Sequence, residues 1–205
     1  MSLPEVVPYA SKRVLGMDVS ADPWTHGVVD ELLPRVFAGA LVDEVFAQAE
    51  FALARRDDGA KTYSLATRRL SEDIGPYTSS LLQMVASSTY RDALAQRLGR
   101  DISSVPVAVD AWRYGPGDWL SAHVDKPEKL LTQVLYLSSD WASGDGGHLA
   151  LLKTSEPRSV VKRIEPVYLR SVFFVPGTAS WHSVEPPALS SRGRQSLTVT
   201  YLSHE

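Results

Sequence analysis

Six short runs rich in Val, Leu, Tyr and Phe follow one another after Arg100, and clusters of Gly, Pro, Ser and Asp separate them. The runs cover residues 105–114, 133–137, 148–152, 159–164, 171–175 and 196–202. Apolar runs of this length, bounded by turn residues, are typical of β-strands. Several short strands at regular spacing indicate a sandwich or a barrel. We therefore predict a mainly β core over residues 101–205.

The first hundred residues are predicted to be mainly helical. In residues 30–56, apolar side chains recur at steps of about three and four residues, which places them on one helical face. We expect this helix to begin near Pro34. A second amphipathic segment covers residues 77–98 and stops at Gly99. The polar stretch between the two helices is predicted to be a loop with a short strand around residues 63–66.

Length and composition favour one soluble domain. The chain has 205 residues, of which 44% are hydrophobic and 22% charged, values that are ordinary for a globular protein. We expect a single α+β domain over residues 1–205, in which residues 1–100 support the β core. No apolar run is long enough to span a bilayer, and the N-terminal segment lacks the apolar core of a secretory signal. We therefore predict a cytoplasmic protein without a membrane partner.

The residue inventory restricts the chemistry that the chain can perform. The chain has no cysteine, which excludes disulfides, zinc-thiolate clusters, iron–sulfur clusters and thiol catalysis. Any metal site must therefore use histidines and carboxylates. The formal net charge is -3, and no basic block is available to follow a phosphate backbone. Nucleic acid is not an expected partner.

His123 and Asp125 stand two residues apart in the segment WLSAHVDKP. On an extended backbone such residues point to the same side, so both side chains can reach one ion while Val124 faces away. The pair alone is a weak signal, because both residue types are common in proteins. A third candidate ligand, His182, follows the predicted strand at residues 171–175. Together the three residues predict a metal site.

Two histidines and one carboxylate form the facial triad of non-haem Fe(II) oxygenases. Three protein ligands leave three coordination positions for a bidentate co-substrate and O2. A rival interpretation is a zinc hydrolase, in which the metal activates a water molecule. The sequence places no obvious general base beside the ligands, which argues against that alternative.

The last predicted strand has a polar face. Alternation places Arg194, Ser196, Thr198 and Thr200 on that face. An Arg inside a barrel is costly unless an anion pairs with it. A dicarboxylate supplies such an anion, because Arg binds carboxylates in a bidentate pair. Two alternatives stay open: an exposed edge-strand position for Arg194, and a role for Arg192, which lies in a turn where exposure is expected.

An ordered series of seven motifs in residues 105–203 resembles the prolyl-4-hydroxylase-like branch of the Fe(II)/2-oxoglutarate-dependent dioxygenases. Any one motif could arise by chance, but seven in the same order are specific. The motifs are Tyr114-Gly-Pro-Gly, His123-Val-Asp125, Tyr136-Leu-Ser-Ser-Asp-Trp141, Gly146-Gly147-His-Leu, Val175-Pro-Gly, His182-Ser-Val-Glu-Pro and Arg194-Gln-Ser-Leu-Thr-Val. The first hundred residues match this family only in general character, as helices that buttress a sheet.

The resemblance implies a double-stranded β-helix, which is a jelly-roll of two packed sheets, with N-terminal helices and a metal at its open end. It implies Fe(II) held by His123, Asp125 and His182, with 2-oxoglutarate and O2 as co-substrates. The residues expected to contact 2-oxoglutarate are Arg194 and Tyr136 at the distal carboxylate, Tyr114 nearby, and Thr198 through a water molecule. Trp112 and Trp119 are predicted to line the substrate pocket, although a buried Trp more often has a packing role.

The implied activity is hydroxylation of an unactivated C–H bond, with oxidative decarboxylation of 2-oxoglutarate to succinate and CO2. We expect a small-molecule substrate, such as a free amino acid or a natural-product intermediate, because the chain is short and has no appended recognition domain. The main alternative is a prolyl hydroxylase that acts on a peptide or protein. A β-helix module that binds metal without turnover is a further alternative from a different functional class.

Overall fold

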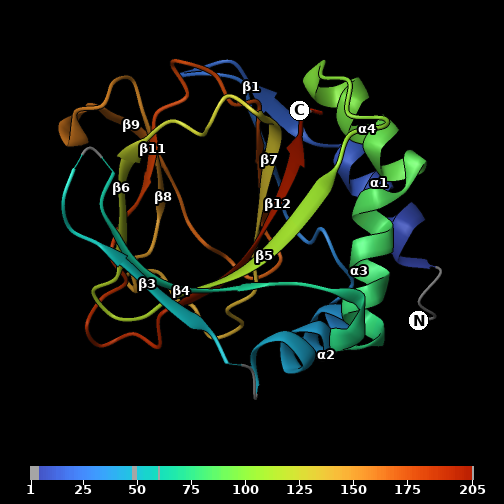
Figure 1. The fold of residues 1–205 in the computed structure, drawn as a ribbon, viewed down its shortest axis with the longest axis horizontal. Helices are drawn as coiled ribbons and strands as arrows, with labels where there is room; N and C mark the ends of the chain where they lie inside the picture. Colours follow the sequence, from blue (N-terminus) through green and yellow to red (C-terminus); the bar gives the residue numbers. More distant parts are fainter. Residues whose placement is uncertain (1–4, 48–49, 60, 205) are drawn as a thin grey trace.

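A computed structural model describes residues 5–47, 50–59 and 61–204 of the chain. Four helices pack on one side of a curled antiparallel sheet (Figure 1). The helices are α1 (Val6–Leu15), α2 (Arg35–Phe46), α3 (Pro76–Ala86) and α4 (Ser88–Leu98), with short 3-10 helices at Glu72–Ile74 and Pro157–Ser159. Within the described residues, no helix is long and apolar enough to cross a membrane.

The predicted helix over residues 30–56 is too long. Helix α2 begins directly after Pro34, as expected, but it ends at Phe46. Residues Ala52–Arg56 instead form strand β3, which pairs antiparallel with β4 (Tyr63–Arg69). The hairpin hydrogen bonds satisfy the backbone of this segment and override its helical periodicity. The predicted strand at residues 63–66 is confirmed as the first part of β4.

The predicted helix over residues 77–98 is two helices. Ser87 has an extended backbone conformation (φ -66°, ψ 144°) and separates α3 from α4. Its hydroxyl accepts a hydrogen bond from the Tyr90 amide at 3.3 Å, so it acts as the N-cap of α4. The predicted stop is confirmed, because Gly99 adopts the left-handed conformation (φ 65°) that ends many helices.

All six predicted strands of the second half are present, with bounds that differ by a few residues. The sequence did not predict β1, β2, β3, β6 and β11. The remaining strands are β1 (Asp18–Ser20), β2 (His26–Val29), β5 (Val107–Tyr114), β6 (Trp119–His123), β7 (Lys129–Tyr136), β8 (Leu149–Leu152), β9 (Val160–Ile164), β10 (Ser171–Phe174), β11 (His182–Val184) and β12 (Arg194–Leu202). The first hundred residues therefore contribute four strands as well as the helices.

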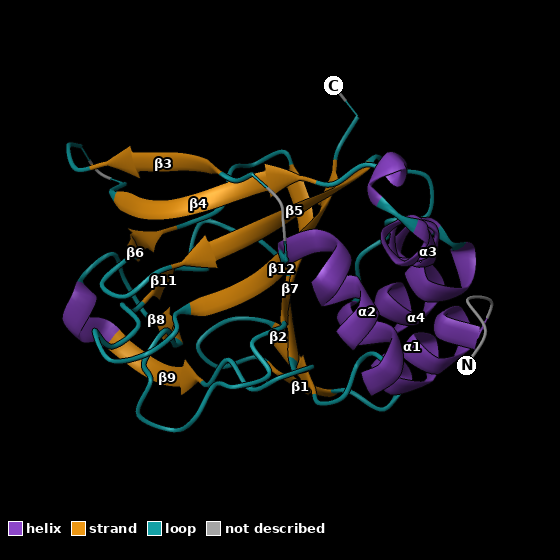
Figure 2. Cartoon of the chain, turned by 90° about the horizontal axis from the view of Figure 1, so that it is seen from below, coloured by secondary structure: helices purple, strands orange, loops and turns teal. Residues whose placement is uncertain are grey.

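The strands follow the order β1-β2-β10-β7-β12-β5-β4-β6-β11-β8-β9. Strand β4 joins the two halves of this order, because its residues 66–69 pair with β5 and its residues 63–64 pair with β6. The sheet thereby curls into two layers. Figure 2 shows the helices on the side of β5, β12 and β7, away from β6, β11 and β8.

Side chains on the two faces of β12 have different surroundings. Leu197, Val199 and Tyr201 belong to the buried cluster that includes the helices, and the Tyr201 hydroxyl donates to the Val85 carbonyl of α3 at 2.8 Å. Arg194 and Ser196 point into the space between the two layers, where they line a cavity. The predicted alternation of β12 is therefore confirmed. Because of this alternation, Arg194 and Ser196 place polar groups between the two layers of the sheet.

Candidate metal centre and co-substrate site

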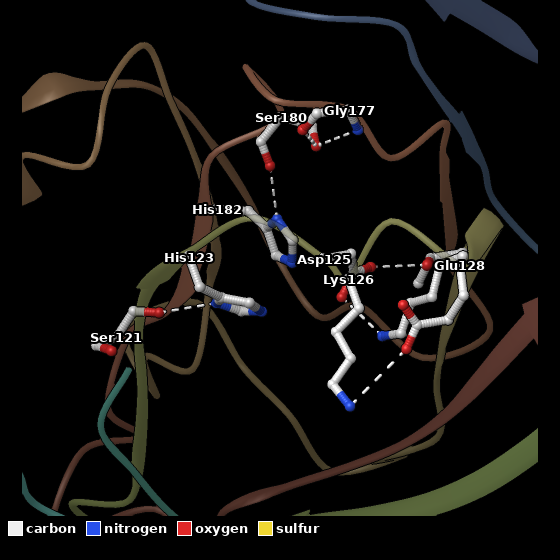
Figure 3. Close-up of polar contacts among 10 residues, drawn as sticks. Ser121, His123, Asp125, Lys126, Glu128, Gly177, Ser180 and His182 are labelled. Carbon is white, nitrogen blue, oxygen red and sulfur yellow. Dashed lines mark hydrogen bonds and ion pairs between the residues drawn. The ribbon is translucent and has the colours of Figure 1, made fainter. Parts of the chain in front are cut away.

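Three candidate metal ligands meet between two strands that are far apart in the sequence. His123 ends β6, Asp125 follows it by two residues, and His182 begins β11. Strands β6 and β11 pair so that His182 lies opposite His123. One ligand atom from each of the three residues lies within 4.8 Å of the others, and Figure 3 shows the three side chains converging. The structure thus brings the predicted triad together.

The backbone fixes the orientation of both imidazole rings. Nδ1 of His123 lies 2.9 Å from the Ser121 carbonyl, and Nδ1 of His182 lies 2.9 Å from the Ser180 carbonyl (Figure 3). A carbonyl can only accept, so each Nδ1 carries the hydrogen and Nε2 keeps its lone pair. Metal-binding histidines in proteins typically donate their other ring N–H to a carbonyl or carboxylate. Both rings are therefore arranged to offer Nε2 to a cation.

The protonation states of the triad suit a divalent cation. Burial lowers the pKa of His123 and of His182, so both imidazoles are neutral. Burial alone would raise the pKa of Asp125, but His182, Lys129 and a hydrogen bond from Thr132 hold it below its usual value. Lys129 Nζ lies 2.7 Å from Asp125 Oδ1, and Thr132 Oγ1 donates to Oδ2 at 2.8 Å. The site thus combines two neutral imidazoles with one oriented carboxylate.

The same triad lines a narrow cavity between the two layers of the sheet, which we call the metal-site cavity. Its volume is about 70 Å³, well below the range of about 300–1,000 Å³ for pockets that hold drug-sized ligands. Its wall consists of Lys61, Trp112, Tyr114, Leu120, His123, Asp125, Lys129, Thr132, Val134, Leu149, Phe174, His182, Val184, Arg194, Ser196 and Thr198. The small volume, and the charged side chains in a wall that is otherwise largely apolar, favour a small ligand with charged groups.

Arg194 supplies a buried positive charge to this cavity. Its exposed fraction is 3%, and its Nη1 donates to the Gly147 carbonyl at 2.9 Å. Its guanidinium lies over the ring of Tyr136 at 4.7 Å and over that of Tyr114 at 5.1 Å. Arg194 makes no ion pair among the described residues, and its Nε has no hydrogen-bond partner there. A buried guanidinium without a carboxylate is costly, so the site fits an anionic ligand.

The two tyrosines beside Arg194 are hydrogen-bond donors. The Tyr136 hydroxyl is buried and has no partner among the residues that the structure describes. Burial raises the pKa of Tyr136 and of Tyr114, so both phenols keep their protons. An unpaired buried hydroxyl next to an unpaired guanidinium is the donor arrangement that a carboxylate would satisfy.

The other predicted residues have different positions. Thr198 lines the metal-site cavity, and so does Trp112, whose Nε1 has no partner in the described part of the chain. Trp119 does not line this cavity; its Nε1 donates to Thr62 Oγ1 at 3.1 Å, and Arg55 covers its ring. The side chain of Arg192 is 88% exposed and lies 3.4 Å from Asp140. Arg192 is therefore not the buried cation.

Four polar residues of the metal-site cavity were not predicted as site residues. Ser196 lies on the predicted polar face of β12, so the alternation pattern already pointed to it. Lys129 and Thr132 orient Asp125, but they lie just before the predicted strand at residues 133–137 and carry no local signature. Lys61 comes from the predicted loop between the helices, and only the three-dimensional structure places it beside the triad.

A larger groove of about 590 Å³ lies elsewhere, around His26, Lys162 and Arg170. It contains none of the predicted site residues. His26 Nε2 accepts from Lys162 Nζ at 3.4 Å, and Arg170 forms an ion pair with Asp30 at 2.6 Å. Size alone therefore does not locate the candidate site.

Comparison with known families identifies the β core. Residues 109–201 match the model of the 2OG-Fe(II) oxygenase superfamily. This range contains the three candidate ligands and Arg194, whereas the four helices lie outside it. A search of curated protein sequences finds no match.

Solved structures with the same fold cover the whole chain. A Pseudomonas putida prolyl-4-hydroxylase matches with a TM-score of 0.71 and 22% identity, over 100% of both chains. A Trichoplax adhaerens prolyl hydroxylase in complex with a hypoxia inducible factor peptide fragment matches with a TM-score of 0.71 and 17% identity, over 98% of this chain and 91% of that one. A Burkholderia pseudomallei oxidoreductase of the 2OG-Fe(II) oxygenase family has a TM-score of 0.62 and 16% identity, over 100% and 92%. These likenesses confirm the predicted double-stranded β-helix with its helical support.

Proposed function

The chain belongs to the 2OG-Fe(II) oxygenase superfamily through residues 109–201, and from this premise we propose that it hydroxylates an unactivated C–H bond of an amino-acid substrate. It is a dioxygenase that uses Fe(II), 2-oxoglutarate and O2. The observation that carries the proposal is the presence of two complementary sites in one cavity. A triad suited to Fe(II) lines the metal-site cavity together with Arg194, a buried cation that makes no ion pair with any described residue.

The protein's residues would hold the metal and the co-substrate in fixed positions. His123 and His182 offer Nε2 and Asp125 offers a carboxylate oxygen to Fe(II), which leaves open positions on one side of the ion. Arg194 and the Tyr136 hydroxyl bind the distal carboxylate of 2-oxoglutarate, with Tyr114 beside them. Arg194 Nε and the Tyr136 hydroxyl have no hydrogen-bond partner among the described residues, so the co-substrate would complete the site.

Bound Fe(II) with 2-oxoglutarate supplies the oxidative chemistry, in which R–H, O2 and 2-oxoglutarate give R–OH, succinate and CO2. The protein contributes orientation and exclusion of water. The aliphatic and phenyl side chains of the cavity wall are Leu120, Val134, Leu149, Phe174 and Val184. With the metal and co-substrate bound, these side chains would exclude water from the reacting C–H bond.

The substrate is proposed to be an amino acid or an amino-acid residue, with prolyl compounds as the first candidates. Two structures of similar fold are titled prolyl hydroxylases, and one of these contains a peptide. That observation favours a peptide substrate. The small volume of the metal-site cavity and its charged wall favour a small molecule instead. Both classes place the same kind of aliphatic ring or side chain beside the iron.

The direct test is to incubate the purified protein with Fe(II), 2-oxoglutarate and O2 in the presence of free amino acids and short prolyl peptides. Succinate formation and a product heavier by one oxygen atom, both dependent on Fe(II), are the expected results. His182→Ala is the matched control and should give neither. If the wild-type protein binds metal but forms no succinate with any substrate or without one, it is a non-catalytic module and the proposal is wrong.

A further inference from the structure

Lys61 is a second cation in the metal-site cavity, and the main chain next to it is firmly held. The Thr62 amide donates to Ser121 Oγ at 2.7 Å, and the Ser121 amide donates to the Thr62 carbonyl at 2.9 Å. Ser121 also accepts from His123 through its carbonyl. The residue after Lys61 is thus attached to the strand that carries the first metal ligand. Lys61 itself lines the cavity that contains the triad.

The charge of Lys61 acts on the candidate ligands. Lys61 lines the same cavity as both imidazole rings, and its positive charge contributes to lowering the pKa of His123 and of His182. Lys61 makes no hydrogen bond or ion pair with any residue in the described ranges. Asp125 is the nearest opposite charge, but its two oxygens already accept from Lys129 and Thr132.

A half-buried cation beside a metal site needs an anion. Burial lowers the pKa of Lys61, and attraction to Asp125 offsets this only in part. With Fe(II) and 2-oxoglutarate bound, the positive charges of the ion, Arg194, Lys129 and Lys61 exceed the negative charges of Asp125 and the co-substrate. Arg194 would bind the distal carboxylate and Lys129 pairs with Asp125, so Lys61 is the cation of the cavity wall without a partner among the described residues. A carboxylate of the prime substrate would supply that partner.

Trp112 provides a neutral donor in the same cavity. Its Nε1 is buried and has no partner among the described residues, and it lies on β5 opposite Ser196. An N–H donor and an ammonium that share one cavity match the two oxygens of a carboxylate. A neutral internal residue of a peptide would leave Lys61 unpaired.

We propose that Lys61 binds a carboxylate of the prime substrate in the metal-site cavity, and that the substrate is a small carboxylic acid of the amino-acid type. The carboxylate belongs to a free amino acid or to the C-terminal residue of a short peptide. This inference rests on the proposed function and specifies its substrate class. Lys61 is then a specificity-determining residue, because it separates acids from amides and from internal peptide residues.

The test compares acids with their amides in binding and in turnover. L-Proline and other free amino acids, their amides, and prolyl peptides with free or blocked C-termini are titrated calorimetrically into the Zn(II)- and 2-oxoglutarate-loaded protein, which does not turn over. The same compounds are then assayed with Fe(II). The wild-type protein should prefer at least one acid over its amide by about 30-fold, the effect of one charge-assisted hydrogen bond pair. Peptides with a free C-terminus show whether the bound carboxylate can belong to a peptide or must belong to a free amino acid.

Variants at position 61 assign the preference to one side chain. Lys61→Met should reduce the preference for the acid to less than about 3-fold, whereas Lys61→Arg should retain most of it. Lys126→Met is the matched control, because Lys126 is 79% exposed and lies 3.8 Å from Glu128, and it should keep the full preference. The affinity for 2-oxoglutarate should stay unchanged in all three variants.

Three results would overturn the inference. The first is a wild-type protein that shows no preference for any acid over its amide or for free over blocked peptides. The second is a preference that survives in Lys61→Met. The third is a loss of 2-oxoglutarate affinity in Lys61→Met, which would make Lys61 a co-substrate ligand. In each case succinate formation by the wild-type protein would leave the proposed oxygenase activity intact, so failure of the two proposals can be told apart.

Discussion

Replacing Arg194 by Ala tests the anchor for 2-oxoglutarate. Arg194 is 3% exposed, and its guanidinium makes one hydrogen bond within the described ranges, from Nη1 to the Gly147 carbonyl, so its remaining donors are available to a ligand. Removing one partner of a buried charge pair costs about 3–5 kcal/mol. In the Arg194→Ala variant the Tyr136 hydroxyl can still donate to the distal carboxylate, so we expect a cost near the lower end of this range. About 3 kcal/mol corresponds to a loss of affinity for 2-oxoglutarate of about 150-fold.

The assay is the dissociation constant of 2-oxoglutarate for the Zn(II)-loaded protein, together with the KM for 2-oxoglutarate with Fe(II). Arg194→Lys should lie between the wild type and Arg194→Ala, because Lys keeps the charge but loses the bidentate geometry. Arg192→Ala should change neither value by more than about twofold, since exposed charges contribute little. If Arg194→Ala binds 2-oxoglutarate as the wild type does, or if Arg192→Ala shows the larger loss, the assignment of Arg194 is wrong.

Three further predictions concern the metal site and the helices. His182→Ala should abolish Fe(II)-dependent turnover and metal binding measured by calorimetry, with an unchanged circular dichroism spectrum; full activity would exclude this residue as a ligand. Thr132→Val removes one hydrogen bond to Asp125 and should weaken Fe(II) binding by about 10–100-fold; unchanged affinity would show that this bond does not orient the carboxylate. Ser87→Ala removes the N-cap of α4 and should lower the free energy of unfolding by about 1 kcal/mol in urea, whereas Ser88→Ala should change it much less; equal effects would contradict the cap.

The β core and the metal triad were accessible from the sequence because their patterns are short and periodic. Alternation along a strand places His123 and Asp125 on one side, and it separates Arg194 from its apolar neighbours on β12. His182 could be assigned to the metal triad only from its place in the ordered series of motifs. Local sequence does not reveal that β11, which carries His182, pairs with β6. The register between distant strands depends on tertiary packing.

The wrong and missed predictions also depend on tertiary packing, which local sequence patterns do not show. Residues Ala52–Arg56 have good helix formers, but pairing with β4 determines their conformation. The break at Ser87 had a signal, since Ser is a favoured N-cap, but the apolar periodicity continues across it. The position of Lys61 in the cavity wall had no signal, because the neighbouring Thr62 is attached to Ser121, which lies 59 positions away. Residues that distant segments contribute to a cavity wall cannot be predicted from local sequence patterns.

The most direct measurement of the central claim is the fate of ¹⁸O2 in the presence of Fe(II) and 2-oxoglutarate. A dioxygenase of this superfamily should place one ¹⁸O atom in succinate, and the label should depend on Fe(II). The account predicts labelled succinate from the wild-type protein and none from His182→Ala, with the second ¹⁸O atom in the hydroxylated substrate once that substrate is supplied. Unlabelled succinate, or no succinate from wild-type protein that binds Fe(II) and 2-oxoglutarate, would contradict it.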